Sequence, residues 1–99
     1  MENVHELWES VGEDEFLMFD RIPEADRPCN SPDICAFIYL DKKFPADRKM
    51  DMVSAAEHDQ IWLRIDSDQQ ESLNKDDVLY LTRCGVFHEA DCDALSMFV

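Results

Sequence analysis

Residues 60–65 read QIWLRI, and this stretch decides the fold. Its three aliphatic side chains alternate with the glutamine, tryptophan and arginine that lie between them. A period of two residues is typical of a β-strand that buries one face. Residues 52–56 predict the partner strand, because the polar turn around His58 and Asp59 separates the two segments.

The chain after this hairpin predicts two short helices. Asp66 or Ser67 provides the N-cap of the first helix, since both side chains can accept a hydrogen bond from the first turn. Asn74 provides the N-cap of the second, which we expect to end at Gly85. Each helix should therefore begin at a defined residue.

The chain before the hairpin also predicts two helices. The first is capped by Asn3 and ends at Gly12, and the second runs from the Ser31 cap to about Lys43. A buried strand remains the alternative for the second helix. Its apolar residues would lie on nearly every side of a helix, and they include Ile, Phe and Tyr, which favour sheets. The first helix is amphipathic, with a buried stripe of Val4, Leu7, Trp8 and Val11.

Three further segments predict strands. Residues 15–22 read EFLMFDRI and alternate in character, which favours a strand. Residues 86–88 and 95–99 predict a terminal hairpin around EADCDA. Helices and strands are thus mixed along the chain. We expect an α+β fold in a single small domain over residues 1–99, with an antiparallel sheet of about four to five strands packed against two to three helices.

The charge of the chain is strongly negative and uneven. The 99 residues contain 23 acidic and 9 basic residues, for a formal net charge of −14. Residues 1–20 hold seven acids and no Lys or Arg, whereas residues 21–50 are almost balanced. This surface disfavours direct nucleic-acid binding, which needs basic residues. No apolar run predicts a membrane span or a signal peptide, so we expect a cytoplasmic protein without membrane contact.

Four acidic side chains form a ridge on the first predicted helix, opposite its apolar stripe: Glu2, Glu6, Glu9 and Glu13. Their steps of four and three residues place the carboxylates about 5–6 Å apart along the helix axis. DNA places one phosphate per strand about every 3.4 Å, which is a spacing of similar order. Further acids follow the strands and helices downstream. The candidate binding face consists of Glu2, Glu6, Glu9, Glu13, Asp66, Asp68, Glu71, Asp76, Asp77, Glu89, Asp91 and Asp93.

This pattern predicts a non-catalytic protein that binds another macromolecule through a negatively charged face. The most specific version is a nucleic-acid mimic whose partner is a basic nucleic-acid-binding protein. In size and charge the chain resembles small phage-encoded inhibitors of host defence, such as anti-CRISPR and anti-restriction proteins. That resemblance rests on no motif, so it assigns no residue roles.

Two alternatives stay open. In the first, the acidity serves only solubility, and the protein is an adaptor or forms a homodimer. Its contact patch would combine aromatic residues with a basic cluster: Trp62, Tyr39, Lys42, Lys43, Arg48 and Lys49. In the second, Cys84, His88 and Cys92 bind a metal, since they are spaced four residues apart.

The remaining chemistry-bearing residues predict no enzyme and no cofactor. The four cysteines lack the close pairs of structural zinc sites and are expected as free thiols. The acids from Asp66 and from Glu89 resemble calcium loops but lack the glycine at the sixth position. Only two glycines are present, and neither forms a phosphate-binding loop.

Overall fold

A four-stranded antiparallel sheet forms one layer of the molecule, and the computed structural model describes residues 4–98 of the chain. The strand order is β1-β2-β4-β3, with each strand antiparallel to its neighbour. The predicted α+β class is confirmed. The strands are β1 (Val53–Glu57), β2 (Gln60–Leu63), β3 (Val86–Glu89) and β4 (Ala94–Phe98).

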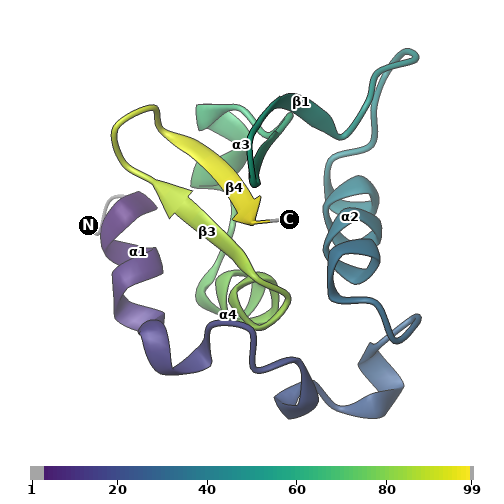
Figure 1. Ribbon diagram of the computed structural model, residues 1–99, viewed down its shortest axis with the longest axis vertical. Helices are drawn as coiled ribbons and strands as arrows, with labels where there is room; N and C mark the ends of the chain where they lie inside the picture. Colours follow the sequence, from purple (N-terminus) through teal and green to yellow (C-terminus); the bar gives the residue numbers. More distant parts are fainter. Residues whose placement is uncertain (1–3, 99) are drawn as a thin grey trace.

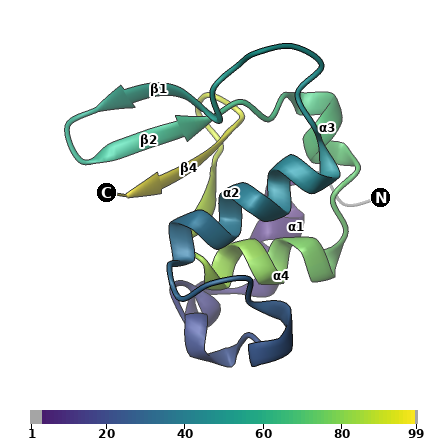
Figure 2. The same cartoon turned by 90° about the vertical axis from the view of Figure 1, so that its right-hand side faces the viewer.

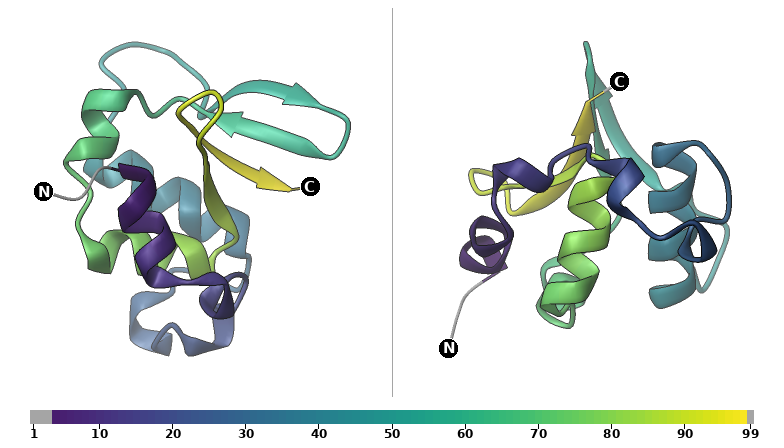
Figure 3. Two further views of the ribbon diagram at one scale, coloured as in Figure 1. Left: turned by 90° about the vertical axis from the view of Figure 1, so that its left-hand side faces the viewer. Right: turned by 90° about the horizontal axis from the view of Figure 1, so that it is seen from below.

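The helices form a second layer. Helix α4 lies between α1 and α2, as the views from the front and from below both show (Figures 1 and 3). The β1–β2 hairpin projects away from these helices (Figure 2). The α-helices are α1 (Val4–Val11), α2 (Pro32–Lys43), α3 (Ser67–Glu71) and α4 (Lys75–Arg83).

The core lies between the sheet and the helices. Val86 and Met97 are paired across β3 and β4, and both are buried on the inner face with Leu95. Leu40 of α2 and Leu81 of α4 are fully buried against the same cluster. Removing a side chain of this size from water contributes about 1.5–3 kcal/mol, so these contacts hold the two layers together.

Most of the predicted elements are confirmed, and the capping residues explain why. The Asp66 side chain accepts a hydrogen bond from Gln69 N at 2.8 Å, and Asn74 accepts one from Asp77 N at 2.9 Å. Both caps are reciprocal capping boxes, which fix where α3 and α4 begin. The two hairpins form as expected, and residues 32–43 are helical rather than a strand. The proposed Asn3 cap lies outside the described residues.

The strand predicted at residues 15–22 is wrong. This segment contains 3₁₀ turns, among them η2 (Phe19–Arg21), and Leu17 has a φ of 60°. A left-handed residue interrupts the alternation of side chains that a strand requires. The Leu17 backbone N–H instead donates to Thr82 O at 3.1 Å, which ties the segment to the end of α4.

An ion pair holds the same segment in place. Arg83 Nε lies 2.7 Å from Glu15 Oε2, and Arg21 binds the other carboxylate oxygen. The hydrogen bond from Arg83 is the main reason why the pKa of Glu15 lies below its usual value. The contact between Arg83 and Glu15 joins residues 68 positions apart, so the local pattern of residues 15–22 carries no trace of it.

The acidic ridge is shorter than its spacing predicts. Gly12 ends α1 at a φ of 88°, and Glu13 already belongs to the turn η1 (Glu13–Glu15). Glu6 and Glu9 remain exposed on the helix, whereas Glu2 lies outside the described residues. Within residues 4–98, the predicted row therefore has two carboxylates on α1, and Glu13 is corrected to a position just beyond its end.

Candidate acidic binding face

Four side-chain contacts connect α1, β3, the β3–β4 turn and α3. His5 Nδ1 lies 3.0 Å from His88 Nδ1, and His5 Nε2 lies 2.8 Å from Glu9 Oε1. On the other side, His88 Nε2 lies 2.9 Å from Asp93 Oδ1. Ser67 Oγ donates to the second oxygen of Asp93 at 2.5 Å. The chain of contacts joins elements from both ends of the sequence.

The two histidine rings lie in the middle of this series of contacts. Each ring contacts a carboxylate through Nε2 and the other ring through Nδ1. The pair therefore links Glu9 of α1 to Asp93 of the β3–β4 turn.

These contacts bring acids from three parts of the chain to one side of the molecule. Figure 3 (left) shows α1, α3 and the β3–β4 turn on that side. Each of these elements carries exposed acidic residues. We call this surface the acidic face; it consists of Glu6, Glu9, Glu13, Asp66, Asp68, Asp91 and Asp93. Glu71, at the end of α3, and Asp76, in the first turn of α4, are also exposed.

Asp77 does not belong to this face. Its carboxylate is buried and accepts hydrogen bonds from the Tyr39 hydroxyl and from Asn74 N, with Lys43 Nζ at 3.0 Å. Burial acts to raise the pKa of Asp77, but these donors outweigh it and hold the pKa below its usual value. The same burial raises the pKa of Tyr39, whose ring stacks on Tyr80 with centroids 4.3 Å apart. Asp77 therefore joins α2 to α4.

Glu89 also has a structural role. On the outer face of the sheet its Oε2 accepts hydrogen bonds from Trp62 Nε1 at 2.7 Å, Gln60 Nε2 at 2.9 Å and Ser96 Oγ at 3.3 Å. The bond from Trp62 is the main cause that holds the pKa of Glu89 below its usual value. This carboxylate spans three strands and is only partly available to a partner.

A groove of about 740 Å³ adjoins the acidic face between α1 and β3. Glu9 and Glu13 line it together with aromatic side chains such as Phe16. Two buried atoms of its lining, Trp8 Nε1 and Thr82 Oγ1, have no hydrogen-bond partner among residues 4–98.

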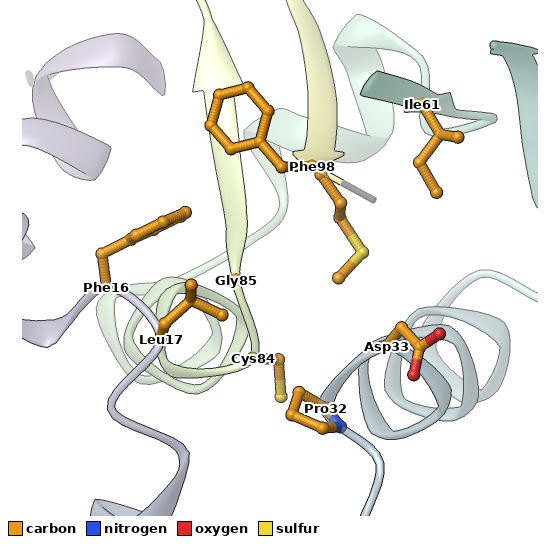
Figure 4. Close-up of a pocket in the computed structure, with 9 residues that line it drawn as sticks. Phe16, Leu17, Pro32, Asp33, Ile61, Cys84, Gly85 and Phe98 are labelled. Carbon is orange, nitrogen blue, oxygen red and sulfur yellow. The ribbon is translucent and has the colours of Figure 1, made fainter. Parts of the chain in front are cut away.

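A second, smaller hollow of about 280 Å³ lies between the start of α2 and the end of α4 (Figure 4). Its lining is mainly apolar, with Leu17 over Gly85 on one side and Phe98 above. Leu17 and Phe98 are 57% and 58% exposed, which is unusual for side chains of this size. Asp33 is its one charged lining residue.

The structure also locates residues of the two alternative sites, the aromatic and basic contact patch and the cysteine–histidine metal site. Tyr39 and Lys43 are engaged by Asp77, and Trp62 by Glu89, so these three do not form one open patch. Cys84 is buried at the end of α4, while His88 points to His5 and Asp93. Across residues 4–98, no three His, Cys, Asp or Glu side chains converge as a metal ion requires.

The contact chain does not build an activated nucleophile. In a serine nucleophile the hydroxyl donates to a histidine base, which a carboxylate orients in turn. Ser67 instead donates directly to Asp93, and the carboxylate lies between the serine and His88. The arrangement fits a structural link between elements.

Sequence reasoning missed the histidine pair. The contact between His5 and Glu9 could have been predicted, because residues four apart on a helix are neighbours. The contact between His5 and His88 spans 83 positions and has no local signature.

Comparison with protein-family models, with curated proteins and with solved structures finds no match. No helix within the described residues is long and apolar enough to cross a lipid bilayer. The function is therefore argued from the residues of this chain alone.

Proposed function

We propose that the protein binds a basic macromolecular partner, without catalysis, through the acidic face. The observation that carries this proposal is the contact chain from Glu9 through His5 and His88 to Asp93 and Ser67. It holds carboxylates from three elements on one side, where their potentials add. A concentrated negative surface attracts a basic partner and accelerates its encounter.

The groove beside the face supports the same proposal. Electrostatic attraction alone gives little specificity, whereas a groove with aromatic walls can select one segment. Phe16 and Phe87 pack edge to face within it, with centroids 6.2 Å apart. A basic partner that inserts an apolar side chain there would gain both kinds of contact.

The more specific form of the proposal is a nucleic-acid mimic. Its partner would be a basic protein that normally binds DNA or RNA, and occupying that groove would inhibit it. We expect this action in the cytoplasm, as with the phage-encoded inhibitors that the chain resembles in size and charge. The net charge of −14 on 99 residues supports this form, since the partner's own ligand is a polyanion.

Affinity capture at low ionic strength from an extract of the cells of origin tests the proposal. Glu6→Gln, Glu9→Gln and Glu13→Gln combined should weaken the captured partner's binding about tenfold or more, since each exposed charge contributes up to about 1 kcal/mol. Duplex DNA should compete for the same partner.

A matched control separates the face from bulk charge. Asp47→Asn, Asp51→Asn and Asp59→Asn remove the same number of charges from exposed positions of the α2–β1 loop and the β1–β2 turn. This variant should retain the partner. Equal losses from both triple variants would show that only net charge matters, and would refute a defined binding face.

A further inference from the structure

Two cysteines outside the acidic face lie in direct contact. Cys29 precedes α2 and Cys35 lies within it, and their Sγ atoms are 3.4 Å apart. A disulfide has an S–S bond of about 2.05 Å, so the sulfurs need to approach by only about 1.4 Å. The residues between them form the entry to one helix, outside the sheet.

The two thiols differ in access to solvent. Cys29 is half-buried, whereas Cys35 is completely buried beneath it. Each is held by a backbone carbonyl: Cys29 Sγ lies 3.6 Å from Ser31 O, and Cys35 Sγ lies 3.4 Å from Cys29 O. An oxidant therefore reaches the Cys29 sulfur, with the Cys35 sulfur already in contact behind it.

The other two cysteines are poor competitors. Cys84 is fully buried, and burial raises its pKa to about 12, which keeps it a protonated thiol. Cys92 is exposed on the β3–β4 turn, at the far side of the molecule from the start of α2 (Figure 1). Partial desolvation and the neighbouring Glu89 raise the pKa of Cys92, and burial also raises the pKa of Cys35. The contact between the two sulfurs, rather than a low pKa, therefore distinguishes Cys29 and Cys35.

We propose that Cys29 and Cys35 form a reversible oxidation site, which hydrogen peroxide converts to an intramolecular disulfide. In the first step the Cys29 sulfur attacks peroxide: an S–O bond forms, the O–O bond breaks and one water leaves. In the second, the Cys35 sulfur attacks Cys29: the S–S bond forms, the S–O bond breaks and a second water leaves. Two thiols lose two electrons and two protons, which reduce one peroxide to two waters.

The disulfide would join the segment before α2 to the second turn of that helix. It would leave the acidic face untouched, because neither cysteine contacts α1, α3 or the β3–β4 turn in the hydrogen bonds described above. The site is therefore independent of the proposed binding function.

Peptide mapping of the intact chain tests the proposal. Reduced protein is treated with hydrogen peroxide, unfolded and alkylated with N-ethylmaleimide in guanidinium chloride so that buried thiols also react, and cleaved with trypsin. Arg27 precedes a proline and resists cleavage, so Cys29 and Cys35 share the peptide of residues 22–42, while Cys84 and Cys92 share that of residues 84–99. The first peptide should lose the mass of two hydrogen atoms and take no label, and the second should take two labels. Dithiothreitol before alkylation should restore full labelling.

Other outcomes overturn the proposal. These are a cross-link between the two peptides, a disulfide within residues 84–99, or sulfinic acid at Cys29 with Cys35 still labelled. Two variants add a direct control. Cys29→Ser, at a half-buried position, should abolish the protected peptide, and Cys92→Ser should leave it unchanged.

Discussion

The Nδ1 atoms of His5 and His88 lie 3.0 Å apart and join the first helix of the chain to the third strand of its sheet. Each ring also faces a carboxylate, Glu9 on one side and Asp93 on the other. Helix α1 is also held by apolar packing, because its buried Trp8 belongs to the hydrophobic core. The histidine pair adds a polar link to that packing.

His5→Ala should loosen α1 without unfolding the protein. The loss of the hydrogen bond to His88 should cost about 1–2 kcal/mol in the free energy of unfolding, measured by urea denaturation. Amide hydrogen exchange should accelerate in α1 more than in α4. His58→Asn, at the exposed β1–β2 turn where φ is 54°, is the control and should change neither quantity. Unchanged exchange in α1 would contradict the linking role of His5.

Asp77 should make the stability depend on acid pH. Its pKa is lowered in the folded protein, so its ionised form stabilises the fold above about pH 4, and this contribution is lost as the pH falls further. Asp77→Asn should cost about 1–3 kcal/mol at pH 7 and flatten the fall in stability between pH 5 and 2. Asp76→Asn neutralises an exposed neighbour in the same helical turn and is the control. Equal pH profiles of the two variants would refute the role of Asp77.

Glu89→Gln should weaken the outer face of the sheet. Glutamine retains an acceptor oxygen for Trp62 but loses the charge that strengthens this hydrogen bond, so we expect a lower urea midpoint of unfolding. The fluorescence of Trp62 should shift in the folded state. Glu57→Gln, on the exposed strand β1, removes the same charge and should change neither stability nor emission. If Glu89→Gln changed neither stability nor emission, the charge of Glu89 would add nothing to its hydrogen bonds.

Alanine at Gly85 should lower the free energy of unfolding more than alanine at Gly12 does, because of Leu17. Both have positive φ, so alanine at either position should cost about 1–2 kcal/mol. A Cβ at Gly85 would also lie 2.7 Å from Leu17 Cδ2, whereas one at Gly12 meets nothing within 4 Å. Gly85→Ala should therefore cost more in the wild-type background and the same as Gly12→Ala in a Leu17→Ala background. A difference that persists in that background would point to another cause.

Local signals in the sequence predicted most of the fold. Asp66 and Asn74 cap α3 and α4 because their side chains bond the backbone three residues on, an interaction that needs nothing else from the protein. The alternation in residues 60–65 likewise places Leu63 and Ile65 in the core. Caps and strand alternation depend on residues that are close in sequence, so the sequence pattern predicts them.

The segment at residues 15–22 and the acidic face depend on distant partners instead. Leu17 adopts its left-handed backbone where it bonds Thr82, and Glu15 binds Arg83, which lies 68 positions away. Asp77 and Asp76 are adjacent and equally acidic, yet one is buried and the other exposed. Charge alone could therefore not distinguish face residues from structural ones.

The central claim is that the negative surface of this protein is concentrated on the acidic face. Titration of isotope-labelled protein with an oligoarginine peptide, followed by amide chemical shifts at low ionic strength, tests it most directly. The largest shifts should fall in α1, in α3 and at residues 90–93, and they should diminish as salt is added. Shifts of equal size across residues 41–59, which carry Asp47, Asp51 and Asp59, would contradict the claim.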